Sequence, residues 1–288
     1  MNTVIDETQW RAREAAHRER ADSLTAAWRE RVRTAAKHPV DDFLFTYYPY
    51  RPSLLRRWHP GAATLENAAH DERASWKWYR VEGANLAVDT ASLLVERAAS
   101  IRFISSLLAS TAARPGNFGC FGLHEWAMAY KADEQRHAVA LRLGAAGTDA
   151  VVEQARIACT HIDAYRFFTP EAAPLNKLRP TRENQPLMEQ PGCLHANMDV
   201  YKWAIKLGPL VAGETLLDSF ELARDIRELD MRASPYDLAD WGLVPVQIET
   251  EHGRAEYEVA QRGFAERAQQ LRARIIAELP LLAEEPAQ

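Results

Sequence analysis

The sequence lacks the features of membrane-spanning and secreted proteins. No stretch of its 288 residues approaches the ~20 uninterrupted apolar residues that a transmembrane helix requires. The N-terminal segment MNTVIDETQWRAREAAHRER is highly charged and has no apolar core, unlike a secretory signal peptide. We therefore expect a cytoplasmic protein with no membrane partner.

The sequence also has few cysteines and no excess of positive charge. The chain has three cysteines, at positions 120, 159 and 193, and no Cys-x-x-Cys pair. An odd number of scattered thiols predicts neither a disulfide framework nor a zinc knuckle, and it fits a reducing compartment. The net charge of −5 weighs against a protein that wraps long nucleic acid, because such proteins are usually basic. A local basic patch is still compatible with this charge.

The sequence does contain a series of helical patterns separated by irregular segments. We expect helices over residues 4–37, 86–113, 119–143, 148–168, 196–208, 214–231 and 254–279. The segment SWKWYRVEG predicts a short strand or hairpin. The predicted fold is mainly α, a single-domain helical bundle-like fold with long irregular loops and at most a small β-hairpin. An N-terminal helix over residues 1–37 continues into a helical catalytic or binding domain over residues 38–288.

The first irregular segment, DFLFTYYPYRPSLLRRWHPG, is rich in aromatic residues. Prolines within it prevent a long helix. So much aromatic surface must either be buried or bind a ligand. The candidates for contact with a planar substrate are Tyr47, Tyr48 and Trp58.

The second irregular segment, residues 169–193, contains five prolines. Ordered loops of this length are often functional. This one supplies Arg179, Arg182 and Gln185, whose hydrogen-bond donors suit a phosphate group or a base edge. The alternative is an ordinary solvated loop.

Several polar residues fall on apolar helical stripes and indicate a metal site. Glu134 and His137 form a Glu-x-x-His pair on the apolar face of the expected 119–143 helix. Two such pairs and two further glutamates build di-iron sites in helical bundles. Glu96 is predicted to point inward as another ligand, and His161 is a further candidate. The alternative is that these histidines are core residues satisfied by their neighbours.

The stretch EQPGCLHANMDVYKWAIKLG places His195, Asp199, Lys202 and Lys206 on one helical face. A histidine oriented by an aspartate is a plausible catalytic unit, whereas the alternative is a solvent-facing polar stripe. His161 and Asp163 are two residues apart, so they form no dyad unless the helix is broken there.

A separate polar pair lies on the expected 214–231 helix. Arg227 lies on its apolar stripe, three residues from Asp230. A buried arginine needs a partner, so we expect an internal Arg–Asp pair. The functional alternative is a fixed guanidinium that is presented to an anionic or hydrogen-bonding ligand.

Seven strings together resemble a known family: DFLFTYYPYRP, RWHPG, LHEWAMAY, CTHIDAYRFFTP, PTRENQ, EQPGCLHANMDVYKWA and DMRASPYDL. They are similar to an actinobacterial family commonly labelled 3-methyladenine DNA glycosylase, over residues 38–270. The chain has no helix-hairpin-helix pattern followed by a catalytic aspartate, so no functional residue is transferred from a defined motif. The resemblance implies an N-glycosylase-type hydrolase that acts on a modified purine base in DNA or a nucleoside.

This hypothesis requires no cofactor. Its catalytic carboxylate would be Asp163, Asp199 or Asp230, and its base slot would come from the aromatic segment. A second hypothesis is a metal-dependent oxidase or hydrolase of a small molecule, which uses iron, for example as a di-iron centre, or another divalent metal. A third is a non-enzymatic protein whose loops bind a ligand.

Overall fold

The computed structural model describes residues 3–48, 50–133 and 139–280. The strands are β1 Val4–Ile5, β2 Thr64–Leu65, β3 Tyr79–Glu82 and β4 Asn85–Val88. The helices are α1 Glu7–Thr34, α2 Phe43–Tyr47, α3 Pro52–Leu55, α4 Thr90–Ala112, α5 Leu123–Ala129, α6 Gly144–Gln154, α7 Ile162–Tyr165, α8 Gln185–Met188, α9 Leu194–Leu207, α10 Gly213–Arg232 and α11 Glu251–Glu278. Short 3-10 turns lie at Glu72–Ser75, Ala173–Leu175, Gly208–Leu210 and Ala239–Trp241.

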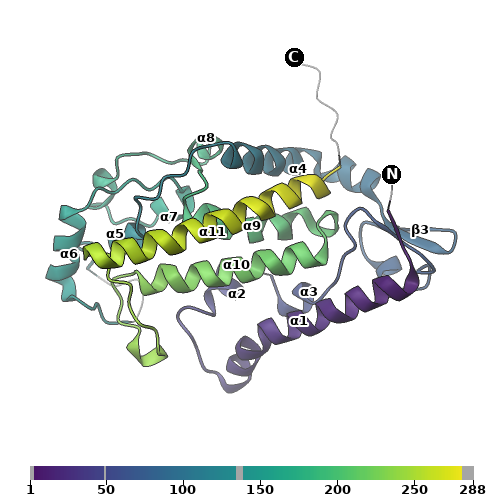
Figure 1. The fold of residues 1–288 in the computed structure, drawn as a ribbon, viewed down its shortest axis with the longest axis horizontal. Helices are drawn as coiled ribbons and strands as arrows, with labels where there is room; N and C mark the ends of the chain where they lie inside the picture. The colour runs from purple at the N-terminus through teal and green to yellow at the C-terminus, as the bar shows by residue number, and fades with distance from the viewer. Residues whose placement is uncertain (1–2, 49, 134–138, 281–288) are drawn as a thin grey trace, which may run out of the picture.

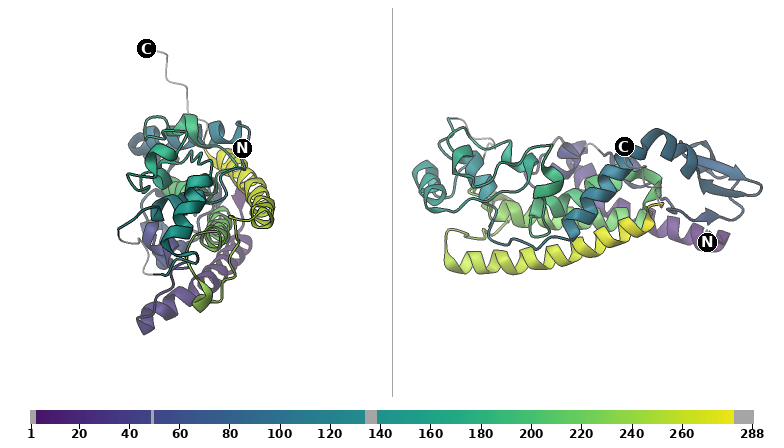
Figure 2. Two further views of the ribbon diagram at one scale, coloured as in Figure 1. Left: turned by 90° about the vertical axis from the view of Figure 1, so that its left-hand side faces the viewer. Right: turned by 90° about the horizontal axis from the view of Figure 1, so that it is seen from above.

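Long helices form the centre of the molecule. α9 packs against α10 and α11, α11 also packs against α4, and α1 lies along α10. Figures 1 and 2 show an elongated molecule with the strands near one end and α6 near the other. The prediction of a mainly α fold is confirmed. Among the described residues, no helix is both long enough and apolar enough to cross a membrane.

The N-terminal helix α1 is joined to the bundle by ion pairs. Asp6 caps its first turn by accepting a hydrogen bond from the Gln9 amide, which satisfies one of the free N–H groups of a helix start. Further along, Arg20 pairs with Asp218 and Glu221 of α10, at 2.7 Å in both cases. α1 therefore packs on the helical body.

The small sheet is larger than the predicted hairpin. β3 and β4 form the expected antiparallel pair, and Gly83 in their turn has a φ of 64°, which glycine adopts without steric strain. β2 extends this pair, and β1 pairs in parallel with β2, giving the order β1-β2-β4-β3. Strands of two residues are too short to produce an alternating pattern, so β1 and β2 were not predicted.

Among the described residues, the helix expected over residues 119–143 is confirmed only at α5 and is wrong on either side of it. α5 ends at Ala129, after which Tyr130 is extended and Lys131 has a left-handed φ of 48°. The Lys131 amide donates to the Asp149 carboxylate at 2.9 Å rather than to a helical carbonyl. Glu134 and His137, the predicted metal-binding pair, lie outside the described residues.

The expected helix over residues 148–168 is also divided. α6 ends at Gln154, and the chain becomes helical again only in α7. Between them, the Cys159 amide donates to the Asn176 side chain at 2.7 Å, so the backbone bonds to the proline-rich loop instead of to itself. The break places His161 at the start of α7, in an extended conformation.

A buried arginine organises the end of the molecule that contains the sheet. The Arg73 side chain is 0% exposed and pairs with Glu14 and Asp71. Its guanidinium lies 5.5, 5.3 and 5.6 Å from the ring centroids of three tryptophans, Trp10, Trp58 and Trp76. These are cation–π distances. Trp58 is itself fully buried, so it belongs to this core and presents no face for stacking on a base.

A half-buried histidine in the same region predicts a pH-dependent stability. His59 shares a 2.7 Å hydrogen bond with the Tyr79 hydroxyl, and burial, with a smaller contribution from Arg73, lowers its pKa to about 3. Below pH ~6.5 the unfolded state binds the proton more readily, so folding stability falls as the pH drops from ~6.5 toward that value. We expect wild type to lose about 2 kcal/mol more than His59→Gln between pH 7 and pH 5.

Urea unfolding at the two pH values measures this difference. The matched control is His70→Gln, because His70 is exposed. Equal losses in wild type and His59→Gln would contradict the prediction.

Candidate metal centre

The candidate site is built around the start of α9. Gly192, two residues before the helix, packs so closely on the backbone of Asn117 that a Cβ atom would overlap it. Gln190 accepts hydrogen bonds from the amides of both residues, each at 2.7 Å. This tight turn fixes where α9 begins, and it places His195 in the first helical turn, 9% exposed.

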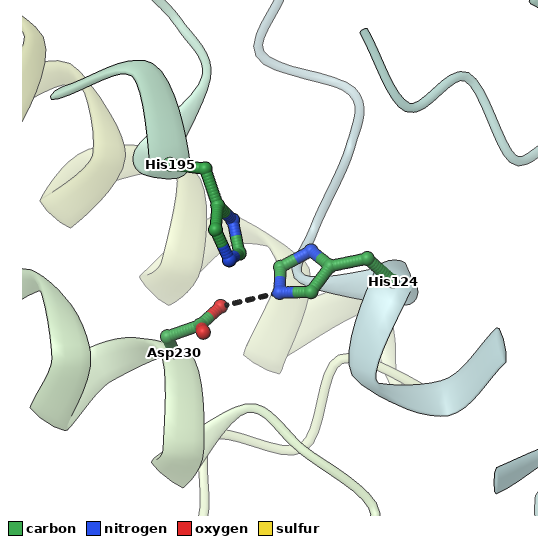
Figure 3. A group of neighbouring side chains, drawn as sticks. All are labelled: His124, His195 and Asp230. Atoms are coloured by element: carbon green, nitrogen blue, oxygen red, sulfur yellow. Dashed lines mark ion pairs between the residues drawn. The ribbon is translucent and has the colours of Figure 1, made fainter. Parts of the chain in front are cut away.

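His195 meets two other ligand-type side chains from distant parts of the chain. His124 comes from α5 and Asp230 from α10, and Figure 3 shows all three pointing toward one another. One candidate ligand atom from each lies within 4.8 Å of the other two. His124 Nε2 lies 3.0 Å from Asp230 Oδ1, and the two imidazole centroids are 4.4 Å apart. Two histidines and one carboxylate are a common catalytic metal-ligand set.

The charge states of Asp230 and His195 favour cation binding. Burial alone would raise the pKa of Asp230, but the nearby His124 and Arg227 hold it well below its usual range. Burial, with repulsion from His124, lowers the pKa of His195 well below its usual value. His195 is therefore neutral at pH 7 and has a nitrogen lone pair available for a metal ion.

His124 has the opposite shift. Burial alone would lower its pKa, but Asp230 and the Cys120 side chain raise it well above the usual value. Neither His124 Nε2 nor Asp230 Oδ1 has a hydrogen bond of good geometry, although both are buried. These two atoms contact each other as a 3.0 Å ion pair, and a metal ion bound by both would replace the His124 proton that lies between them.

Arg227 fixes two carboxylates beside the cluster. Its Nη1 donates to Glu125 at 3.0 Å and to Asp230 at 3.2 Å, and its guanidinium stacks 4.0 Å from the Phe43 ring centroid. The predicted internal Arg227–Asp230 pair is confirmed. Arg227 Nε and Glu125 Oε2 are buried without a hydrogen-bond partner, so each has capacity to contact a further group.

A second cluster lies on the other side of His195. His161 Nε2 is 3.3 Å from both Glu189 and Asp199, and its ring centroid is 5.4 Å from that of His195. Burial alone would lower the pKa of His161, but hydrogen bonding to Asp199 and Glu189 raises it to about 9. His161 is therefore protonated at pH 7.

The carboxylates of this second cluster already have donors. Lys202 and the Tyr48 hydroxyl donate to Asp199, the latter at 2.8 Å, and Gln185 donates to Glu189 at 2.6 Å. Three ligand-type atoms also meet here, but a lysine bound to one carboxylate competes with a cation. The first cluster is the better metal site because it contains a neutral histidine, His195, whereas the histidine of the second cluster is protonated.

Asp163 connects the second cluster to the surface. It is 5% exposed and pairs with Arg182, with Lys202 at 3.3 Å and with Arg166 at 3.4 Å. Burial alone would raise its pKa, but Lys202 and other cations lower it. The expectation that His161 and Asp163 face apart on a helix does not apply, because the chain is extended, not helical, at His161.

Two small cavities flank the His195 ring. One, of about 30 Å³, is lined by Phe43, Tyr47, Glu125, Met128, Asp163, Phe167, His195 and Arg227. The other, of about 10 Å³, is lined by Cys120, His124, Cys159, Cys193, His195 and six further residues. The larger has room for a water molecule but is far smaller than the pocket of a drug-sized ligand. A substrate larger than water therefore requires movement of its walls.

The structure brings together many but not all of the predicted site residues. His195, Asp199, His161, Asp163, Asp230 and Arg227 lie in the two adjoining clusters, and Tyr47 lines the larger cavity. Tyr48 and Gln185 are buried and serve as donors to the second cluster. The Arg179 guanidinium bonds to backbone carbonyls of its own loop.

The prediction that Glu96 points inward is wrong. Its side chain is 54% exposed and pairs with Lys77 at 2.9 Å. The buried face of α4 includes Leu93, Ile101, Ile104 and Leu108, so Glu96 and the 41% exposed Phe103 lie outside it.

Sequence reasoning missed His124, Glu125 and Glu189. All three are polar residues whose neighbours are buried, as in LHEWAMAY, where every residue from 123 to 130 is buried. A short helix that is buried on all sides shows little periodicity of polar and apolar residues, so its sequence does not indicate which side chains face a site. The gathering of all three cysteines around one cavity was not predictable either.

Comparisons with known proteins add no assignment to these residues. No family model matches the chain, and neither the curated proteins nor the solved structures contain a match. The roles considered below therefore come from the geometry of the chain itself.

Proposed function

We propose that this protein is a metal-dependent hydrolase whose centre is held by His124, His195 and Asp230. The observation that carries the proposal is the convergence of these buried side chains from three helices, with one ligand-type atom of each within 4.8 Å of the other two and with His195 neutral at pH 7. Three protein ligands leave coordination positions open for water and substrate. A divalent ion bound there supplies a water molecule of lowered pKa.

The residues around the larger cavity have complementary roles in hydrolysis. Glu125 lines the cavity together with His195, and its unpaired Oε2 can accept the proton of the attacking water. Arg227 holds the other oxygen of Glu125 at 3.0 Å, which orients the carboxylate. The free Arg227 Nε can donate to an oxygen that becomes negative during the reaction.

Elemental analysis tests the metal centre directly. Protein purified without added metal or chelator is expected to retain about one divalent ion per chain, because the three neighbouring ligands form a single site. Treatment with a chelator should remove this ion and lower the midpoint of thermal unfolding, because an ion that binds only the folded state stabilises it. Protein that retains no ion, and whose unfolding midpoint is unchanged by zinc, manganese, cobalt and ferrous ions, would overturn the proposal.

The second candidate function is a specific hydrolytic reaction, the cleavage of an N-glycosidic bond. The observation in its favour is that Phe43, Tyr47 and Phe167 line the same cavity as Asp163 and His195, since aromatic walls suit a planar base. Release of free base from alkylated DNA and from modified nucleosides tests it. If metal-replete protein releases base from neither substrate, this candidate is excluded while the metal centre stands on its own measurement.

A further inference from the structure

An unusual concentration of positive charge lies beside the cavity that His195 lines. Asp163, one of its lining residues, pairs with Arg166, Arg182 and Lys202. Lys202 is shared with Asp199. Three cations therefore serve two carboxylates, although the chain as a whole has a net charge of −5.

Lys206 adds a fourth cation to this group. It lies one helical turn after Lys202 on α9 and is exposed. Partial burial, followed by repulsion from Lys202, lowers its pKa, with Arg182 contributing. The second cluster does not offset this charge, because protonated His161 is balanced by Glu189. Two positive charges remain in excess.

Aromatic surface lies directly beside these cations. The Arg166 guanidinium is 4.4 Å from the Phe167 ring centroid, and Phe167 lines the cavity with Tyr47. Tyr47 is close enough to the charged group for Asp199, Asp163, Arg166 and Arg182 all to influence its pKa, although burial is the larger cause of its raised value. The edge of the cavity at Asp163 and Phe167, here called its mouth, thus has aromatic residues next to guanidinium and ammonium groups.

We propose that the substrate is a small aromatic anion whose phosphate or carboxylate group is bound at this mouth by Arg166, Lys206 and the outer face of Arg182. Guanidinium groups bind both kinds of anion through paired hydrogen bonds. The aromatic part then lies against Tyr47 and Phe167, directed toward the metal centre. The orientation of the substrate toward the metal centre rests on the proposed hydrolase function, whereas the binding of the anion itself does not require the metal.

Calorimetric titration with three probes tests the inference: phenyl phosphate, benzoate and neutral phenol. The full-length wild-type protein is expected to bind at least one of the two anions in the millimolar range or more tightly, and phenol at least roughly tenfold more weakly. A comparison of the two anions identifies the preferred group. Binding should weaken as salt rises, because exposed charges are screened.

Variants then locate the site. The double variant Arg166→Gln/Lys206→Gln changes two exposed residues and is expected to weaken anion binding roughly tenfold or more. Arg262→Gln, which removes an exposed arginine paired with Glu258, should leave it unchanged. Circular dichroism verifies that both variants are folded.

Chelator-treated wild-type protein separates this inference from the proposed function. Because the treatment removes the ion and leaves every lining residue of the cavity in place, the protein should still bind the preferred anion. Loss of binding after chelation would show that the anion binds the metal, and it would overturn the inference. Equal binding of phenol, unchanged binding by the double variant, or no binding of either anion would also overturn it. An absent metal would count only against the hydrolase.

Discussion

Replacing His195 with alanine is expected to remove metal binding with little effect on the fold. His195 is the histidine of the first cluster whose pKa is lowered, so its nitrogen is unprotonated and available to a metal ion. Its loss leaves only two of the three ligands. Changes to residues that merely support a ligand weaken metal binding by about 10- to 100-fold, so removal of the ligand itself should cost more than 100-fold. Any hydrolytic activity should fall with the metal content.

Thermal unfolding with and without added ion measures this effect. At an ion concentration about 100 times the dissociation constant, wild type should gain about 2.7 kcal/mol, whereas His195→Ala should gain almost nothing. His252→Ala is the matched control, because His252 is exposed in the first turn of α11. The assignment of the centre fails if His195→Ala and His252→Ala retain the same amount of metal.

Replacing Arg73 with methionine is expected to cost about 3–5 kcal/mol of folding free energy, because it leaves the Asp71 carboxylate without its cationic partner and Glu14 with Arg18 alone. Glu14 is 11% and Asp71 12% exposed at the side chain, so water replaces the guanidinium poorly. Methionine also loses the attraction between the cation and three tryptophan rings. The loss should exceed the ~1 kcal/mol typical of a surface ion pair.

Urea unfolding provides the measurement, followed by tryptophan fluorescence. Arg33→Met is the control, since Arg33 is 72% exposed and pairs only with Glu30 among the described residues. We expect it to change stability by less than about 0.5 kcal/mol. A loss for Arg73→Met no larger than that of the control would show that water compensates Glu14 and Asp71.

The long helices could be predicted from sequence because their signals are local. α1 and α11 begin at Asp6 and Thr250, side chains that cap free amides of the first turn, and α9 and α10 have clear apolar faces. The helices expected over 119–143 and 148–168 failed where Lys131 and Cys159 bond to groups 18 and 17 residues away. Such pairings depend on tertiary structure and leave no periodic pattern.

The candidate site was predictable only in part for the same reason. His195, Asp199 and Arg227 stand out because they occupy faces of recognisable helices. Which residues they contact is a different question: the expected partnership of His195 with Asp199 is replaced by contacts of Asp199 with His161, Lys202 and Tyr48. His124 and Glu189 could be paired with them only once the break before α7 and the short α5 were known.

The close contact of Gly192 with Asn117 has a consequence for how the two clusters can change. His195 and Asp199 are separated by one turn of the same helix, so neither can move along the α9 axis without the other. Gly192 and the Gln190 hydrogen bonds hold the start of that helix against the segment that leads to His124. The position of Gly192 therefore determines where both His195 and Asp199 lie. Even a methyl group at this position would shift both clusters together, which makes this glycine as important for the chemistry as any ligand.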